Sequence, residues 1–485
     1  MAGLHDLYDG RVQDLSPSGV AAAVGRLSQG PVEADRHDEA HLRAAEDGLR
    51  VWFDELEEHR RNPLFHIGNL DLACYDRDYA PAVERDDARR RHLTAWPDAV
   101  DAAVASLDRV PSAVAEALAG AVAGLADGVE DPAALAAHRR LVDHVDGFRE
   151  RGEPDPSLGD SALARLMGTG DAMAVDLGRL SERADQERDR LVALLSEATA
   201  RRAPGRPPMA VVEELMRDHP EPDGVYVAAE ALVREATAFT VDRDLLPELG
   251  GECKVGPAPP SRRWGMAMMS WSAPHEADAA SWYYVTPPDP SWSHEAQEEW
   301  LAVFSRTTLP AITVHEVTPG HFAHGRMLRR ARGDVRRCLF SESFVEGWAH
   351  YVEELFVEEG FRADDPRYVI GVCIEALVRV TRLACAIGIH TGAMSVADAV
   401  SRFEADAFYK GPAARAEALR ATYDPTYGRY TWGKWEIQAA RAEAEARWGR
   451  RYTHRRFHEA VLALGSPPLG LLDDIFEGAS PTSVP

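Results

Sequence analysis

The feature that most constrains this fold is the recurrence of apolar residues at helical spacing over long stretches of the chain. From Val83 to Asp127, apolar residues recur three or four positions apart, as at Ala99 and Ala103, with charged residues between them. This period places the apolar side chains on one face of an α-helix. Arg36–Arg60 and Ser161–Arg201 repeat the pattern. The sequence therefore predicts a mainly α-helical protein whose charged residues form solvated helix faces.

One segment departs from this pattern. Seven prolines between Gly250 and Trp300 break any long helix there. Two aromatic-rich stretches between the prolines, Trp264–Trp271 and Trp282–Val285, predict a short hairpin or small sheet near residues 264–286. We therefore expect an N-terminal helical region (1–250), a proline- and aromatic-rich segment with short strands (251–300), a second helical region (301–475) and a disordered tail (476–485). The first three regions are expected to pack as one unit around a central cleft.

Composition excludes several classes of partner and location. The chain has 54 basic and 79 acidic residues, a net charge of −25, which disfavours nucleic acid and anionic membranes as partners. Its five cysteines are scattered without a Cys-x-x-Cys pair, so neither a disulfide framework nor a thiolate zinc site is indicated. Met1–Asp9 lacks an apolar run of signal-peptide length, and no stretch approaches the roughly 20 apolar residues of a membrane span. These features predict a cytoplasmic protein.

The segment from His315 to His321, which reads His-Glu-Val-Thr-Pro-Gly-His, carries the clearest chemical signal. Two neutral imidazoles are typical zinc ligands, and an adjacent glutamate is left free to act on the metal-bound water. The two histidines usually stand four positions apart on one helical face, but here they are six apart, so an unbroken helix would direct them differently. Pro319 and Gly320 lie between them and allow a break that brings His321 back beside His315.

A third ligand is expected on a helix about thirty residues later. Glu342, Glu346, His350 and Glu353 lie on roughly one face of that helix, among large apolar residues. A charged, solvated helix edge would show the same residue types. The spacing alone therefore leaves both the site and the choice of ligand open.

These motifs resemble those of a bacterial protein family, domain-of-unknown-function family 885. Its members look like helical zinc metallopeptidases of the zincin type. The His315–His321 segment is followed by Glu346-Gly347-Trp348-Ala349, and this pair of motifs is the core of the resemblance. The match extends from about residue 65 to 473. Further segments similar to the family's signatures are Arg77–Pro81, Arg382–His390, Tyr430–Lys434 with Arg441, and Phe457–Leu469.

The resemblance implies one large zincin-like domain that binds a single Zn²⁺ ion. His315, His321 and Glu346 become its ligands, with Glu342 as the fallback for the third position. Glu316 becomes the general base. The sequence departs from the family pattern at His324 and His350, which adds both residues as possible extra ligands or proton carriers.

Four further residues have a functional and a structural interpretation. Tyr430 matches a family position and can stabilise an oxyanion, or it packs as a core tyrosine. Arg441 can bind a substrate carboxylate, or it pairs with one of the many glutamates. His390 can orient a ligand or serve the structure alone. Tyr284 and its aromatic neighbours can form a substrate wall or a core cluster.

The function predicted from these residues is zinc-dependent hydrolysis of amide or peptide bonds. Glu316 would activate the metal-bound water, and the substrate would be a small peptide or an amino-acid amide. Three alternatives stay open. They are a specialised hydrolase of a small amino-acid conjugate in a biosynthetic pathway, a catalytically silent binding protein on the same scaffold, and an iron(II) enzyme, since two histidines and a carboxylate also suit that metal.

Overall fold

The computed structural model describes residues 3–276 and 279–476. Helices account for most of these residues, and one three-stranded sheet is present among them. The predicted mainly α-helical fold with a small sheet is therefore confirmed. The disordered tail predicted at 476–485 falls, apart from its first residue, outside the described residues. None of the described helices combines the length and apolar character needed to cross a lipid bilayer.

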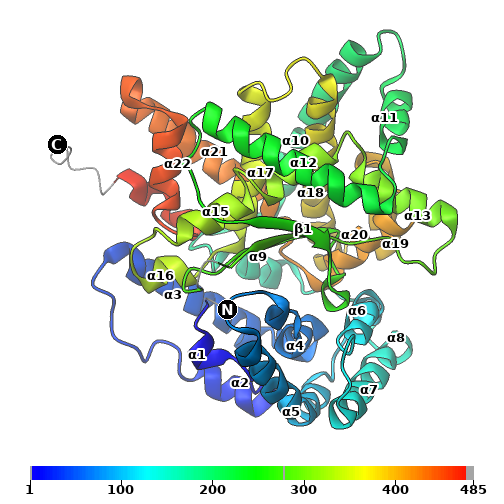
Figure 1. Ribbon diagram of the computed structural model, residues 1–485, viewed down its shortest axis with the longest axis vertical. Coiled ribbons are helices and arrows are strands. Elements are labelled where there is room, and N and C mark those ends of the chain that lie inside the picture. The colour runs from blue at the N-terminus through cyan, green and yellow to red at the C-terminus, as the bar shows by residue number, and fades with distance from the viewer. Residues whose placement is uncertain (1–2, 277–278, 477–485) are drawn as a thin grey trace.

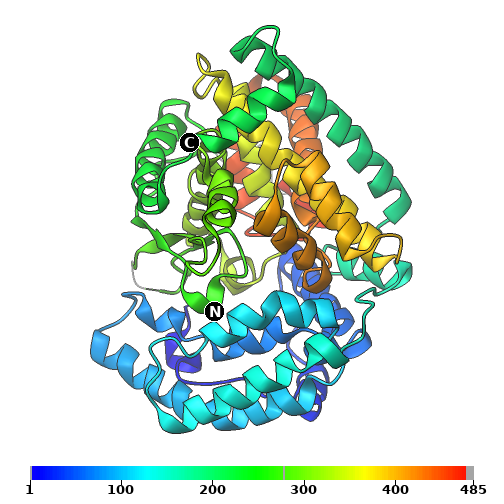
Figure 2. The ribbon, with the colours of Figure 1, turned by 90° about the vertical axis from the view of Figure 1, so that its right-hand side faces the viewer.

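The N-terminal helices form the lower half of the molecule in Figure 1, and Figure 2 shows the same division from the side. Their core includes Trp96, Leu118 and Leu141, which are almost completely buried. The side chain of Asp131 caps α7 by accepting the backbone N–H of Ala134. The helices of this half are α1 (His5–Tyr8), α2 (Pro17–Val24), α3 (Arg36–Arg50), α4 (Pro63–Leu70), α5 (Ala82–Ser106), α6 (Ser112–Gly124), α7 (Pro132–Asp146) and α8 (Phe148–Arg151), with short turns η1 (Val51–Glu55), η2 (Glu58–Arg60) and η3 (Ala73–Asp76).

The remaining helices form mainly the upper half in both views (Figures 1 and 2). They are α9 (Asp160–Gly168), α10 (Leu177–Arg202), α11 (Pro208–Arg217), α12 (Pro222–Asp242), α13 (His294–Leu301), α14 (Leu309–Glu316), α15 (His321–Leu328), α16 (Gly333–Cys338), α17 (Glu342–Glu358), α18 (Pro366–His390), α19 (Val396–Asp406), α20 (Gly411–Tyr423), α21 (Arg429–Trp448) and α22 (His454–Leu462), with turns η4 (Pro260–Arg262), η5 (Ala302–Phe304), η6 (Gly449–Arg451) and η7 (Leu469–Phe476).

Helix α18 is the centre of this half. It is apolar around most of its circumference, and most of its residues are buried, as expected for a helix with neighbours on every side. It packs against α10, α14, α17, α20 and α21. Pro366 at its first position and the Asp365 side chain, which accepts the backbone N–H of Arg367, fix where it begins.

The sheet has the strand order β1-β3-β2. β3 (Ser281–Val285) pairs in antiparallel fashion with β2 (Ala267–Ser270), within the two stretches predicted as strands. β1 (Cys253–Pro257) pairs in parallel with β3 and was not predicted, because its Gly256 and Pro257 are residues that disfavour strands. β2 is an edge strand, so its outer backbone groups have no strand partner.

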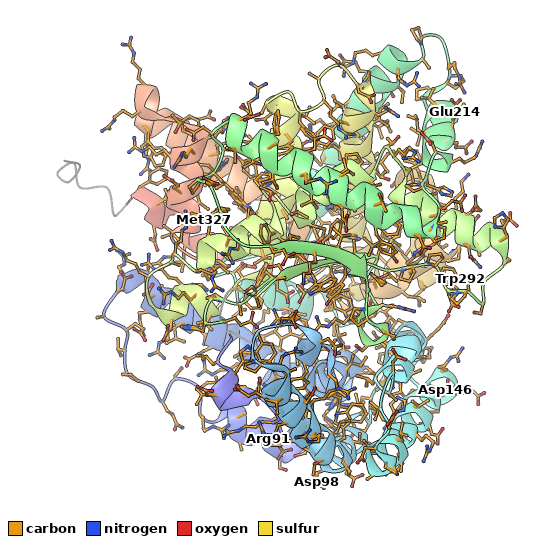
Figure 3. The ribbon with its side chains drawn as sticks, in the orientation of Figure 1. Arg91, Asp98, Asp146, Glu214, Trp292 and Met327 are labelled. Carbon is orange, nitrogen blue, oxygen red and sulfur yellow. The ribbon has the colours of Figure 1, made fainter. Side chains whose placement is uncertain are left out.

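Charged side chains cover the outside of the helices. Figure 3 labels Arg91 and Asp98 on α5, Asp146 on α7 and Glu214 on α11, and all four are exposed. These residues lie between apolar positions that face the core, which is the amphipathic pattern read from the sequence.

Helices α17 and α21 cross at two glycines, Gly347 and Gly433. A Cβ atom on Gly347 would lie 2.4 Å from the carbonyl carbon of Gly433, and one on Gly433 would lie 1.9 Å from the carbonyl oxygen of Ser343. Real Cβ atoms do not approach other atoms so closely. The crossing therefore requires glycine in both helices. It also constrains the distance between Glu346, which precedes Gly347, and Tyr430, which lies three residues before Gly433.

We expect Gly347→Ala to lower the free energy of unfolding by about 1–3 kcal/mol, because the added methyl group has no space and the two helices must separate. Urea unfolding followed by circular dichroism measures this change. The matched control is Gly120→Ala in α6, where a Cβ atom meets nothing within 4 Å. That control should be neutral or slightly stabilising. Equal effects of the two substitutions would contradict a tight crossing.

Candidate metal centre

The side chains of His315, His321 and Glu346 converge at one point between α14, α15 and α17. One ligand atom from each lies within 4.8 Å of the other two, and among residues 3–276 and 279–476 no other such group of histidines, cysteines and acids is found. The Nε2 atoms of His315 and His321 lie 3.3 and 3.2 Å from Glu346 Oε2. The structure thus brings together the three residues that the resemblance implies as ligands.

The loop between α14 and α15 explains how histidines six positions apart meet. Helix α14 ends at Glu316, and α15 begins at His321. At Gly320 a Cβ atom would lie 1.8 Å from the carbonyl oxygen of His315, so only glycine fits at this position. The expected break is present, and it places the two imidazole rings 4.7 Å apart.

Trp348 connects this loop to the helix that carries Glu346. Its indole Nε1 donates a hydrogen bond of 2.9 Å to the carbonyl oxygen of Pro319. The indole is fully buried. Because Trp348 lies two residues after Glu346, this bond fixes the position of the loop, and hence of His321, relative to the carboxylate.

Glu353 orients the first histidine. Its Oε1 accepts a 2.7 Å hydrogen bond from His315 Nδ1, its Oε2 lies 3.3 Å from His350 Nδ1, and its Oε1 lies 3.1 Å from Arg379 Nη2. Burial opposes ionisation of Glu353, but the Arg379 charge and the hydrogen bonds to His315 and His350 outweigh it and lower the pKa of the carboxyl. An ionised Glu353 can only accept, so His315 Nδ1 carries a proton, and Nε2 is the nitrogen that faces Glu346. A carboxylate behind a histidine is the usual support of a metal ligand.

The geometry fits a tetrahedral metal ion. Ligand atoms at about 2.1 Å from tetrahedral zinc stand about 3.4 Å apart, close to the 3.2 and 3.3 Å found between Glu346 Oε2 and the two imidazoles. Glu346 Oε2 is buried and makes no hydrogen bond, and the same is true of Glu316 Oε2. Buried oxygens without a partner are costly. A cation bound to Glu346 would satisfy the first of them.

The acid–base properties of the group reflect its burial and its charges. Burial and the Arg379 charge lower the pKa of His315, but the carboxylates of Glu346 and Glu353 outweigh both and raise it to about 9. Burial opposes ionisation of Glu346, yet its proximity to His321 and its contacts with both imidazoles hold its pKa well below the usual range. Burial raises the pKa of Glu316. In the metal-free protein, the positive charge beside Glu346 therefore comes from protonated His315.

The group opens into a cleft of about 880 Å³ between the two halves of the molecule. One wall is aromatic and comes from η1 and α4, where Trp52, Phe53 and Phe65 lie in edge-to-face contact. The edge strand β2 forms another part of the wall. Arg420 and Arg429 supply cationic groups to the lining.

Two predicted residues lie in this cleft beside His315, His321 and Glu346. The ring of Tyr430 stacks on that of His315 with a centroid distance of 6.0 Å, and its hydroxyl accepts a 3.1 Å hydrogen bond from Arg420 Nη2. Glu342 also lines the cleft, but it is exposed and lies 3.1 Å from Arg429 Nη2. The structure therefore places Glu346, and not Glu342, with the two histidines.

Three other predicted histidines are buried and do not belong to the converging group. His324 Nε2 lies 3.0 Å from Ser466 Oγ, and His350 contacts Glu353. His390 Nε2 donates to the carbonyl oxygen of Ala421 at 2.8 Å. Burial lowers the pKa of His324 to about 3 and that of both His350 and His390 to about 4, so all three are neutral.

Arg441 and Tyr284, predicted to contact substrate, are not among the residues that line the cleft. Arg441 forms an ion pair with Glu358 at 2.8 Å, which is the structural interpretation of this residue. Tyr284 stacks on Trp282 at 5.5 Å within the sheet. Sequence position could not separate these cases, because the direction of each side chain depends on how its helix or strand packs.

Comparison with known proteins places the chain in a family. The family described as "Bacterial protein of unknown function (DUF885)" matches residues 172–475, well over half of the chain. The chain belongs to this family. The matched region holds His315, His321 and Glu346, and it excludes the aromatic wall contributed by η1 and α4.

Solved structures share the fold of this DUF885 protein. A protein of unknown function from Shewanella oneidensis, provisionally named a lipoprotein, is 18% identical with a TM-score of 0.73, and the alignment covers 97% of this chain and 94% of that one. A protein from Colwellia psychrerythraea, also provisionally named a lipoprotein, is 15% identical with a TM-score of 0.74, covering 98% and 94%. Identities this low show the fold alone. No curated protein matches the chain. The cytoplasmic location stays a prediction.

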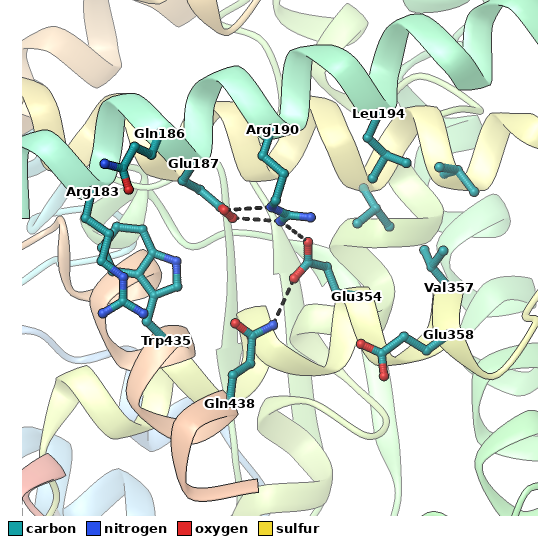
Figure 4. Close-up of a pocket in the computed structure, with 12 residues that line it drawn as sticks. Arg183, Gln186, Glu187, Arg190, Leu194, Glu354, Val357, Glu358, Trp435 and Gln438 are labelled. Carbon is teal, nitrogen blue, oxygen red and sulfur yellow. Dashed lines mark hydrogen bonds and ion pairs between the residues drawn. The ribbon is translucent and has the colours of Figure 1, made fainter. Parts of the chain in front are cut away.

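A second pocket, of about 510 Å³, lies between α10, α17, α18 and α21 (Figure 4). There Glu354 accepts hydrogen bonds from Arg190 and Gln438, and the buried Lys434 lies 2.7 Å from Glu187 and 3.3 Å from Glu354. These charges neutralise one another. In the DUF885 protein, Glu353 and Glu354 thus point from different faces of α17, and Glu353 is the one on the side of His315.

We expect Glu346→Gln to lose bound zinc, while Glu342→Gln retains one ion per chain, because only Glu346 faces both imidazoles. Metal content after dialysis against a weak chelator, measured by mass spectrometry, tests this pair. The two variants remove the same charge from the same helix, so each controls for the other. Zinc retained by Glu346→Gln and lost by Glu342→Gln would reverse the assignment.

We also expect zinc binding at pH 7.5 to release about one proton. With a pKa of about 9, His315 is protonated in the metal-free protein at this pH, and a ligand must be neutral. Glu346 contributes no proton, because its pKa is lowered. Affinity should therefore rise with pH up to about 9. Calorimetry in buffers of different ionisation enthalpy counts the protons, and binding without proton release would contradict the assignment.

Proposed function

We propose that this DUF885 protein is a zinc-dependent hydrolase of amide bonds in small peptides or amino-acid amides. The observation that carries the proposal is the position of Glu316. It follows a ligand directly, lines the cleft, and has a buried carboxylate oxygen with no hydrogen-bond partner. A carboxylate that is neither a ligand nor part of an ion pair is available for proton transfer.

Glu316 is suited to act as the general base. Its raised pKa, caused by burial, makes the carboxylate a stronger base than an exposed one. A zinc ion at the neighbouring ligands supplies the positive charge that favours ionisation of water near neutral pH. Glu316 takes a proton from the attacking water, and it returns that proton to the amine nitrogen as the C–N bond breaks. The products are a carboxylic acid and an amine.

Tyr430 is suited to stabilise the oxyanion formed by attack on the carbonyl. Because its hydroxyl oxygen accepts from Arg420, its own proton is free to be donated into the cleft. Burial raises the pKa of Tyr430, so the hydroxyl stays protonated.

The edge strand β2 supports a peptide-like substrate. Ala267–Ser270 line the cleft, and β3 pairs with only one side of this strand. An extended peptide can add its backbone to the free side. The cleft volume is typical of sites for small molecules, which favours the specialised hydrolase of an amino-acid conjugate as the second candidate. A silent binding protein would have no use for the free carboxylate of Glu316.

We expect Glu316→Gln to bind one zinc ion but to hydrolyse substrate about 10²–10⁴-fold more slowly than the wild type, because glutamine cannot accept the proton. A library of dipeptides and aminoacyl amides, assayed by amine release with zinc-loaded protein, provides the substrate. Glu342→Gln is the matched control and should stay active. Activity of Glu316→Gln equal to the wild type would exclude this base.

A further inference from the structure

We infer that Arg420 and Arg429 bind a free carboxylate at the end of the substrate, and that this protein therefore releases C-terminal amino acids or very short peptides. The inference rests on the proposed function and specifies its substrate class. It would make the enzyme an exopeptidase or an amidase of acylated amino acids, and not an endopeptidase.

Asp424 holds the two arginines side by side. Arg420 donates from Nε and Nη2 to Asp424 Oδ2 at 3.1 and 3.0 Å, and Arg429 donates from Nη1 and Nη2 to the two carboxylate oxygens at 2.6 and 3.0 Å. Both arginines line the cleft although they are only 9% and 7% exposed. One buried aspartate neutralises one of two buried positive charges, so the pair attracts an anion.

Glu342 does not complete this neutralisation. It lies 3.1 Å from Arg429 Nη2, but 59% of its side chain is exposed. Because the Glu342 carboxylate is mostly in water, solvent and salt weaken its attraction to the buried Arg429. A substrate carboxylate can therefore displace Glu342 from Arg429 at small cost.

The arginines also have donors to spare. Arg429 Nε is buried without a hydrogen-bond partner. Among the described residues, Arg420 Nη1 makes no hydrogen bond, since those of this side chain come from Nε and Nη2. Each guanidinium offers five N–H groups in a plane that matches a carboxylate. A buried N–H group without a partner, such as Arg429 Nε, indicates that an acceptor is missing. A substrate carboxylate supplies two acceptor oxygens for these N–H groups.

The distance from the ligands sets the length of the released group. The guanidinium carbons of Arg420 and Arg429 each lie 5.8 Å from the ring of Tyr430, which lies 6.0 Å from the ring of His315. At roughly 3.5 Å per residue, no more than about three residues separate the attacked carbonyl from the bound carboxylate. Because a terminal carboxylate belongs to the amine side of the broken bond, the arginines select the leaving amino acid or peptide.

The chain as a whole does not favour anions. Its net charge is −25, so a basic surface does not explain two arginines in this cleft. The remaining explanation is a structural ion cluster around Tyr430. The two explanations differ in what they predict for a substrate without its carboxylate.

The first test compares each active dipeptide with the same dipeptide carrying a C-terminal amide, using zinc-loaded wild-type protein. We expect kcat/KM to be on the order of 10- to 100-fold higher for the free acid, mostly through a lower KM, because the amide loses the charge-assisted hydrogen bonds. Equal rates for acid and amide, or faster cleavage of the amide, would overturn the inference while leaving the proposed function intact.

The second test uses Arg429→Gln, with Arg441→Gln as the control on the same helix. Arg429→Gln should raise KM for the acid on the order of 10- to 100-fold and leave KM for the amide unchanged, whereas Arg441→Gln should keep the preference for the acid. Circular dichroism checks that both variants fold. A loss that is the same for acid and amide would assign Arg429 a structural role.

A third measurement does not require hydrolysis. The Glu316→Gln protein is titrated by calorimetry with one dipeptide acid and its amide, and the acid should bind on the order of 10- to 100-fold more tightly. If the wild type cleaves neither form, the proposed function fails, and this titration alone decides the inference. Equal binding of the two forms, or no binding of either, overturns it.

Discussion

The buried carboxylate of Glu353 is the contact on which the rest of this structure depends. It comes from α17 and binds His315 of α14, Arg379 of α18 and His350 of its own helix, so one fully buried charge joins three helices. A charge removed from water is tolerated only when its partners are in place. The helices can therefore pack only in the arrangement that supplies those partners, and this arrangement also directs the Nε2 of His315 towards Glu346.

Helix α17 carries the other contacts that shape the site. Glu346 faces the two imidazoles, Gly347 allows α21 to approach, and Trp348 binds the carbonyl of Pro319. Tyr430 and Arg429 begin α21, so the glycine crossing also sets how near the cationic end of the cleft lies to the ligands. Three consecutive residues thus couple the His315–His321–Glu346 group, the loop between the histidines and the wall that would hold the substrate.

The sequence predicted the helical class, the position of two strands and the two histidines that converge. These predictions depend on local spacing: apolar periodicity, prolines, and a His-Glu pair next to a Pro-Gly break. Glu346 was implied only by the family resemblance, because spacing left it level with Glu342. The sequence did not predict β1, because Gly256 and Pro257 disfavour strands; pairing with β3 stabilises this strand. It also left Arg441 open between substrate and ion pair, since both interpretations suit an arginine on a helix, and the structure pairs it with Glu358.

By itself, then, the sequence determined which chemical groups are present and the break that lets two histidines six positions apart meet. Only the tertiary structure decided which carboxylate joins them, because Glu342 and Glu346 share a helical face. Packing places His315 of α14 against Glu346 and Arg429 of α21 against Glu342. It alone brought Arg420 and Arg429 into the cleft around Asp424 and set Glu353 behind His315. The physical reason is that the burial and partners of a charge arise from helices far apart in the chain, which local periodicity does not record.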